Sequence, residues 1–206
     1  MSLTRSPWVV GVSGASGTGY AAAVIRGLLD AGAPVDLVIS RAARLTLLDE
    51  TGVSWNDANW AERAERWLGR DVDGLAHWSP ADLAAGPSSG SYPAAGMIVV
   101  PASTDAVAGI ALGLSKDLLQ RAAGVTLKEG RRLVVVPREM PLARATLSHL
   151  LTLAEAGAVV APASPAFYAD SREVQQLIDF VAGKILDAIG IDHTLFARWT
   201  GRLRGS

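Results

Sequence analysis

Five loops of this 206-residue chain carry hydroxyls, charges or glycines, and each directly follows a short apolar segment. The first loop spans 13–19 with the sequence SGASGTG, and the others begin at Ser40, Ser103, Arg138 and Pro162. Glycines let a backbone approach a ligand closely, and the N-terminus of a following helix attracts an anion. The loops therefore predict a site for a ligand that carries a negatively charged group.

The strongest cationic candidate is Arg138, which follows an apolar segment and precedes Glu139. An arginine can hold a phosphate with two parallel hydrogen bonds, and an adjacent carboxylate suits proton transfer. Tyr168 is a candidate for a further phosphate donor. Arg121 and Lys128 belong to the same basic stretch of sequence, although a solvated surface charge is the default interpretation for each. We therefore expect phosphate binding and proton transfer around Arg138.

Other nucleotide and hydrolase sites fit the first loop poorly. Its spacing is not the G-x-G-x-x-G of dinucleotide-binding proteins, and the next apolar segment ends in Ser40-Arg41 rather than in an acid. A P-loop is excluded because the chain has no G-K-[ST]. Residues 14–18 lack the last glycine of the G-x-S-x-G nucleophile elbow, and a hydrolase would need His149 or His193. A tight turn without a ligand remains the alternative.

The composition excludes several classes of protein. Half of the residues are hydrophobic and 19% are charged, with a mean hydropathy of +0.26 and a pI near 6.3. The apolar runs 8–12 and 97–102 are far too short to span a bilayer, and the balanced charge argues against a nucleic-acid binder. The lack of cysteine and the wide spacing of the histidines give no metal site. We expect one cytoplasmic domain over 1–206, with 1–6 and 201–206 as flexible tails.

Apolar segments alternate with helical patterns, which predicts an α/β fold with a parallel sheet covered by helices on both faces. The expected strands are 8–12, 34–39, 97–101, 133–137 and 158–161. The expected helices are 20–29, 40–50, 105–112, 116–126, 142–156 and 173–189. We expect a three-layer, flavodoxin-like (Rossmann-like) sheet with strand order about 2-1-3-4-5. Its strands would bring all five loops to one edge, where such folds bind ligands.

The segment 53–90 is less regular and holds four of the six tryptophans, namely Trp55, Trp60, Trp67 and Trp78. Such residues are more typical of a core or of subunit contacts than of a cofactor cage. Because the composition is apolar for a 21.4 kDa chain, we expect this segment and the loop 86–93 to lie at subunit interfaces.

Several motifs in register resemble the UbiX-type flavin prenyltransferase family. They are GVSGASGTGY at 11–20, SRAA at 40–43, SGS at 89–91, GMIVVP at 96–101, LQRAA at 119–123, LKE at 127–129, VPREMPL at 136–142 and GAVVAPASPAFY at 157–168. The resemblance runs from about residue 8 to 199 and is weakest across 53–86. It implies a metal-independent enzyme that joins a dimethylallyl group from dimethylallyl phosphate to reduced FMN. The product, prenylated FMN, would serve a UbiD-type decarboxylase, and relatives are homododecamers whose active sites lie where subunits meet.

The resemblance also implies roles for individual residues. The FMN-binding positions would be Gly14, Ala15, Ser16, Ser40, Ser103, Thr104, Asp105, Ala106 and Arg138. The positions for dimethylallyl phosphate would be Arg121, Lys128, Arg138, Tyr168 and Lys184, with Ser89, Gly90 and Ser91 from a neighbouring subunit. The proton-transfer positions would be Ser16, Glu50 and Glu139. Trp199 matches an aromatic residue that shields the allyl cation, whose charge the face of a π system stabilises.

Departures from the family pattern keep alternatives open. Lys184, Ala102, Gly124 and Gly130 stand where relatives usually have Arg, Cys, Asp and Arg, and a lysine loses the bidentate fork of an arginine. A flavin-dependent decarboxylase of the phosphopantothenoylcysteine type would need a catalytic histidine before the third strand, and His77 is the sole candidate. A non-catalytic protein that binds or delivers FMN is the remaining alternative.

Overall fold

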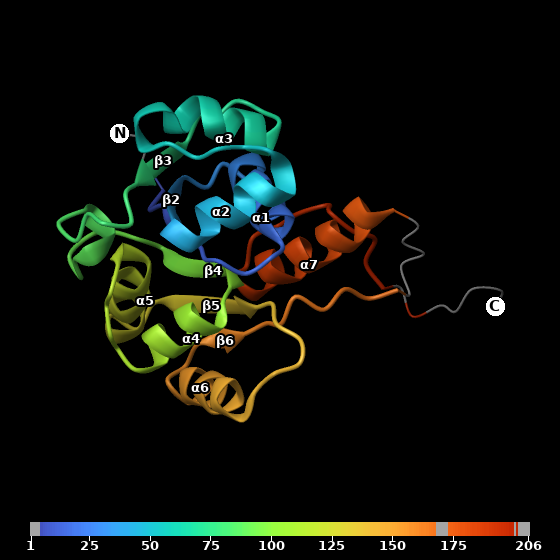
Figure 1. Cartoon of the computed structure of the whole chain (residues 1–206). Coiled ribbons are helices and arrows are strands. Elements are labelled where there is room, and N and C mark those ends of the chain that lie inside the picture. Colours follow the sequence, from blue (N-terminus) through green and yellow to red (C-terminus); the bar gives the residue numbers. More distant parts are fainter. Residues whose placement is uncertain (1–4, 168–172, 200, 202–206) are drawn as a thin grey trace.

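The computed structural model describes residues 5–167, 173–199 and 201 of the chain. Its sheet has the strand order β3-β2-β1-β4-β5-β6, and every neighbouring pair is parallel (Figure 1). The strands are β1 Trp8–Val12, β2 Val35–Ile39, β3 Leu75–Trp78, β4 Gly96–Ala102, β5 Arg132–Pro137 and β6 Val159–Val160. The predicted strands are all present in the predicted order, and β3 adds an edge strand from the segment for which no element was predicted.

Helices cover both faces of the sheet, as predicted. The helices are α1 Thr18–Asp30, α2 Arg41–Thr51, α3 Trp60–Leu68, α4 Thr104–Ala111, α5 Leu118–Lys128, α6 Arg144–Glu155 and α7 Val174–Ala188, with 3-10 turns η1 Asp57–Asn59 and η2 Gly86–Ser88. One buried cluster joins the sheet to α1, α2, α3 and α7, and the other joins it to α4, α5 and α6. In Figure 1, α5 and α7 accordingly lie on opposite sides of the sheet. In the described part of the chain, no helix is long and apolar enough to cross a membrane.

The central strands are apolar because both of their faces are buried. β1, β2 and β4 are buried along their whole length, and alternate residues supply the two cores. Val10 and Val12 belong to the cluster under α1, whereas Val9 belongs to the cluster under α5. This arrangement is typical of parallel strands and explains their near-continuous apolar runs.

Three tryptophans of the middle segment pack in or against the core of one copy. Trp55 and Trp67 are 7% and 8% exposed within the chain itself, and their rings meet edge to face at 6.3 Å. Trp60 packs against the same cluster and stacks on His77. Their side chains therefore complete the core beneath α3, as the core interpretation of these residues predicted, and the subunit contact expected of this segment stays a prediction. The physical reason for this packing is that β3 and α3 extend the sheet and its cover by one unit.

Candidate functional site

The loops after β1, β2, β4 and β5 are hydrogen-bonded to one another at the carboxyl edge of the sheet. Ser13 links two of them, since its Oγ donates to the Pro101 carbonyl at 2.7 Å and accepts from the Ser103 amide at 2.7 Å. The Ser40 amide donates to the Val12 carbonyl at the end of β1. Ser13 is 2% exposed, and its role is to connect the loops after β1 and β4. No role was predicted for Ser13 from the sequence.

A cavity of about 620 Å³ lies between these loops. Predicted FMN-binding positions that line it are Gly14, Ser40, Ser103, Thr104, Asp105 and Ala106. Ser40 and Ser103 are the N-cap residues of α2 and α4, and their hydroxyls accept from the amides of Ala43 and Ala106. The first amides of a helix have no partner inside the helix. The N-termini of α2 and α4 both face this cavity, so amides of both helices can bind a ligand there. Such an edge attracts a phosphate group.

FMN fits the donor set and the shape of this cavity. The backbone at Gly14 lies so close to α2 that an added Cβ would meet the Cβ of Ala42 at 2.5 Å. A side chain at Gly14 would therefore push the loop away from α2 and alter the cavity. Leu45 and Leu119 contribute apolar lining beside the helix N-termini. A flat aromatic ring with a phosphorylated tail needs this combination of apolar wall and anion-binding amides.

A second cavity, of about 380 Å³, adjoins the first loop on the α1 side of the sheet. Its lining includes Ser16, Glu50 and Arg138, together with apolar atoms of Tyr20 and Ile178. The Arg138 Nε donates to the Ser16 carbonyl at 2.9 Å, which holds the guanidinium against the loop. The structure thus brings together residues predicted for proton transfer and for phosphate binding, although they lie far apart in the sequence.

The Glu50 carboxylate occupies the N-terminus of α1. Its Oε1 accepts from the Gly17 amide at 2.7 Å, and its Oε2 accepts from the Thr18 amide at 2.8 Å and the Thr18 hydroxyl at 2.6 Å. Burial alone would raise the pKa of Glu50, but hydrogen bonds from Thr18, Ser16 and the backbone outweigh it and lower the pKa. Glu50 is therefore an anion at neutral pH, coupled to the Ser16 hydroxyl, and can accept a proton rather than donate one.

The remaining phosphate-binding candidates lie in other places. Arg121 and Lys128 are on α5, where the Arg121 Nε donates to the Ser88 carbonyl at 3.1 Å and Lys128 pairs with Glu129. Lys184 is on α7 across the sheet, 3.7 Å from the Asp187 carboxylate. Within one copy, the candidates therefore fall into groups on opposite faces of the sheet.

The other predicted residues are placed as follows. Ala15 is buried in the first loop. Glu139 is exposed, and its Oε1 accepts from the Met140 amide at 3.0 Å. Trp199 is 59% exposed and follows Arg198, which pairs with Asp187 of α7 at 2.6 Å. Tyr168 lies outside the described residues.

His77 and His193 lie away from the site that the competing enzymes would need. The His77 side chain is 3% exposed, and it packs against Trp55 and Trp60. His193 bonds to Asp187 at 3.1 Å and lines a different hollow from Ser16. Neither ring reaches the two cavities described above, and burial lowers the pKa of His77. Among the described residues, no group of three histidines or acids could hold a metal ion.

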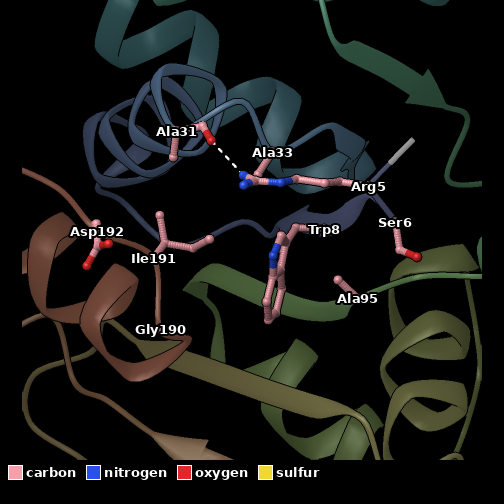
Figure 2. Close-up of a pocket in the computed structure, with 9 residues that line it drawn as sticks. All are labelled: Arg5, Ser6, Trp8, Ala31, Ala33, Ala95, Gly190, Ile191 and Asp192. Carbon is pink, nitrogen blue, oxygen red and sulfur yellow. Dashed lines mark hydrogen bonds between the residues drawn. The ribbon is translucent and has the colours of Figure 1, made fainter. Parts of the chain in front are cut away.

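A further hollow, of about 580 Å³, lies at the opposite edge of the sheet. Figure 2 shows Arg5 extended above the indole of Trp8, with its guanidinium donating to the Ala31 carbonyl. Trp8 begins β1, so this hollow is at the amino end of the strand. None of the predicted site residues lines it, and it is not the candidate site.

Asp36 is a polar residue that the sequence analysis overlooked. It lies in the middle of β2, is 3% exposed, and accepts hydrogen bonds from the side chains of Trp78 and Tyr92. The available signal was an acid inside the otherwise apolar strand VDLVI. A buried carboxylate in such a strand is rare unless its oxygens have donors.

Comparisons with known proteins agree with this geometry. The model of the family described as Flavoprotein matches residues 1–186. The curated flavin prenyltransferase UbiX of Streptomyces coelicolor is 64% identical over 97% of this chain and 98% of its own length. The crystal structure of AnUbiX (PadA1) in complex with FMN and dimethylallyl pyrophosphate superposes with a TM-score of 0.85 at 37% identity, over 97% of this chain and 100% of that one. The crystal structure of a dodecameric FMN-dependent UbiX-like decarboxylase from Escherichia coli superposes with a TM-score of 0.84 at 37% identity, over 95% of this chain and 100% of that one. The chain therefore belongs to the flavoprotein family and, within it, to the UbiX flavin prenyltransferases.

Proposed function

We propose that this chain works in the cytoplasm as a flavin prenyltransferase, which joins the dimethylallyl group of dimethylallyl phosphate to reduced FMN. The product, prenylated FMN, would pass to a UbiD-type decarboxylase. The observation that carries the proposal is that the first loop lines both an FMN-sized cavity and the neighbouring cavity that holds Ser16, Glu50 and Arg138. A protein that only stored FMN would have no need of the Ser16, Glu50 and Arg138 side chains in the second cavity.

The loops at the carboxyl edge of the sheet would each contact a different part of FMN. The N-termini of α2 and α4 hold the phosphate tail, and the glycine at position 14 lets the loop lie against α2. When bound, reduced FMN supplies the electron-rich ring that accepts the dimethylallyl group. Ala15 and the apolar lining exclude water from that ring, which protects a reactive allyl group from hydrolysis.

Cleavage of dimethylallyl phosphate leaves the bonding electrons on the phosphate, whose charge then needs cations and hydrogen-bond donors. Arg138 supplies a fork of N–H groups from the edge of the second cavity. Each bond between the dimethylallyl group and the flavin ring replaces a hydrogen of the ring, which leaves as a proton, and the ionised Glu50 can take a proton through the Ser16 hydroxyl. We assign the return of a proton to the departing phosphate to Glu139, whose exposed carboxyl follows Arg138 directly.

A complete phosphate site requires a second copy of the chain. Arg121 and Lys128 lie on the α5 face, whereas Lys184 lies on the α7 face, so one copy presents two partial sites. Leu147 and Leu151 of α6 are 52% and 59% exposed, which supplies an apolar surface for packing between copies. We propose a homododecamer in which Ser89, Gly90 and Ser91 of one copy complete the phosphate site of its neighbour.

Mass spectrometry of the released flavin tests the reaction. The protein is incubated without oxygen with reduced FMN and dimethylallyl phosphate, then denatured. The expected product is a flavin heavier by one isoprene unit, and release of unchanged FMN from a stoichiometric complex would refute the proposal. The Glu139→Gln variant should retain FMN and lose the product, because only a proton carrier has been removed.

A further inference from the structure

The side chain of Asp36 is a buried acid for which the reaction gives no direct use. Its Oδ1 accepts from the Trp78 indole at 2.9 Å, and its Oδ2 accepts from the Tyr92 hydroxyl at 2.8 Å. Burial raises the pKa of Asp36, while the two hydrogen bonds oppose that rise. Replacing all members of a buried hydrogen-bonded set by apolar groups of the same shape is often nearly neutral, so stability alone is a poor explanation of the presence of this set.

The partner Tyr92 belongs to the loop 86–93, which carries Ser89, Gly90 and Ser91. Its ring meets Trp78 edge to face at 6.4 Å and covers the start of the loop, where a Cβ on Gly86 would reach the ring at 2.5 Å. Burial and the neighbouring Asp36 carboxylate raise the pKa of Tyr92 to about 12. The phenol is therefore a neutral donor at every working pH, and the contact ties the loop to the centre of β2.

The other side of the same loop is tied to α5 and the segment after it. Besides the bond from Arg121 to Ser88, the Arg131 NH2 donates to the Gly90 carbonyl at 2.7 Å. An added Cβ at Gly90 would collide with Glu129 and Lys128, so the backbone lies directly against those charges. The Ser89 and Ser91 hydroxyls are 3.0 Å apart. Three anchors therefore set the shape of a short polar loop.

We infer that Asp36 is a positioning residue, which acts through Tyr92 to hold the loop 86–93 in the shape that presents Ser89, Gly90 and Ser91 to dimethylallyl phosphate. The inference rests on the proposed function, because that function gives the loop its ligand. Among the three anchors, the Asp36 contact is the one that reaches into the sheet. The loop hydroxyls are exposed, so they need such an anchor to stay ordered before the ligand binds.

The Tyr92→Phe variant tests the inference, because it keeps the ring and removes only the hydroxyl. We expect KM for dimethylallyl phosphate to rise about fivefold to tenfold, in line with the typical net contribution of one hydrogen bond, while kcat and FMN affinity stay unchanged. Calorimetric titration of the FMN-loaded protein with dimethylallyl phosphate should show the same loss of affinity. Asp36→Leu should reproduce the effect, because it removes the oxygen that accepts from the Tyr92 hydroxyl.

Two controls separate positioning from general destabilisation. Trp78→Phe removes the other donor to the same carboxylate and keeps an aromatic ring beside Tyr92, so it should lower the melting temperature and raise KM less than Tyr92→Phe does. In a Ser89→Ala, Ser91→Ala background, Tyr92→Phe should raise KM much less, since the two hydroxyls that it positions are gone and only the Gly90 backbone remains.

Equal increases in KM for Tyr92→Phe and Trp78→Phe, or an undiminished effect in the double-serine background, would overturn the inference. Failure of the proposed function would look different, because the wild type would release unchanged FMN. The calorimetric comparison between wild type and Tyr92→Phe still decides the inference in that case, with equal affinities counting against it.

Discussion

Replacing Glu50 by Gln removes the negative charge from the N-terminus of α1 while keeping the size of the side chain. The wild-type carboxylate accepts from Gly17 and Thr18 through both of its oxygens. In Glu50→Gln, one oxygen becomes an amide nitrogen that faces a donor. The variant therefore loses a charge–dipole interaction and gains an unmatched pair of donors.

The expected cost is modest because Glu50 is an exposed residue. A hydrogen bond to a charged group contributes about 1.5–3 kcal/mol when sheltered, and screening by solvent reduces this to about 1 kcal/mol. In a chain of this size, that loss lowers the melting temperature by about 2–4 °C. Product formation should fall much further, because the proton acceptor beside Ser16 is lost.

The dependence on pH separates this explanation from a packing defect. The pKa of Glu50 is lowered from its ordinary value of 4.5, so the unfolded chain binds more protons as the solution becomes acidic. The stability that Glu50 contributes is present above pH 4.5 and is lost as the pH falls through the lower, folded pKa.

The assay compares melting temperatures of wild type and Glu50→Gln between pH 7 and pH 3 at one fixed protein concentration. The two curves should converge at acidic pH, and Glu65→Gln, at an exposed position of α3, should follow the wild type throughout. A gap between wild type and Glu50→Gln that stays constant to pH 3 would refute the charge-based reasoning.

Further substitutions test the rest of the edge and the assembly. Ser40→Ala removes the N-cap hydroxyl of α2 and should cost about 1 kcal/mol in unfolding experiments, together with weaker FMN binding by fluorescence titration. Gly14→Val should abolish FMN binding by forcing the first loop from α2, whereas Gly124→Ala, which meets nothing within 4 Å, should bind FMN normally. Leu147→Glu combined with Leu151→Glu should reduce the mass found by light scattering, because two charges then face the apolar contact between copies; an unchanged dodecamer would place the interface elsewhere.

The sequence was sufficient for the strands and for the edge that they form, because buried parallel strands have unbroken apolar runs such as Trp8–Val12. The helix that begins after Ser40 was equally predictable, since a hydroxyl before a helix commonly caps it, whereas no cap was predicted at Ser103. β3 was not predicted because its sequence LAHW is half-buried at the edge of the sheet and mixes polar with aromatic residues.

Parts of the site depend on contacts that spacing along the chain does not encode. Asp36 meets Trp78 and Tyr92, which lie 42 and 56 positions away, and nothing local to β2 points to either. The separation of Arg121 from Lys184 follows from the faces that α5 and α7 cover, which depends on the handedness of the crossovers. The resemblance to a family identified Arg121 and Lys184 as candidates, but it could not show that the two side chains lie on opposite faces of the sheet within one copy.

The carboxylate at the start of α1 also bears on which nucleotides this fold can accept. In dinucleotide-binding relatives of such sheets, the pyrophosphate rests on the N-terminus of the first helix. Here Glu50 already occupies the Gly17 and Thr18 amides, so a ligand phosphate arriving there would meet a negative charge instead of open donors. We therefore expect this chain to bind dinucleotides poorly, whereas a mononucleotide whose single phosphate lies at the N-termini of α2 and α4 would not meet the Glu50 charge.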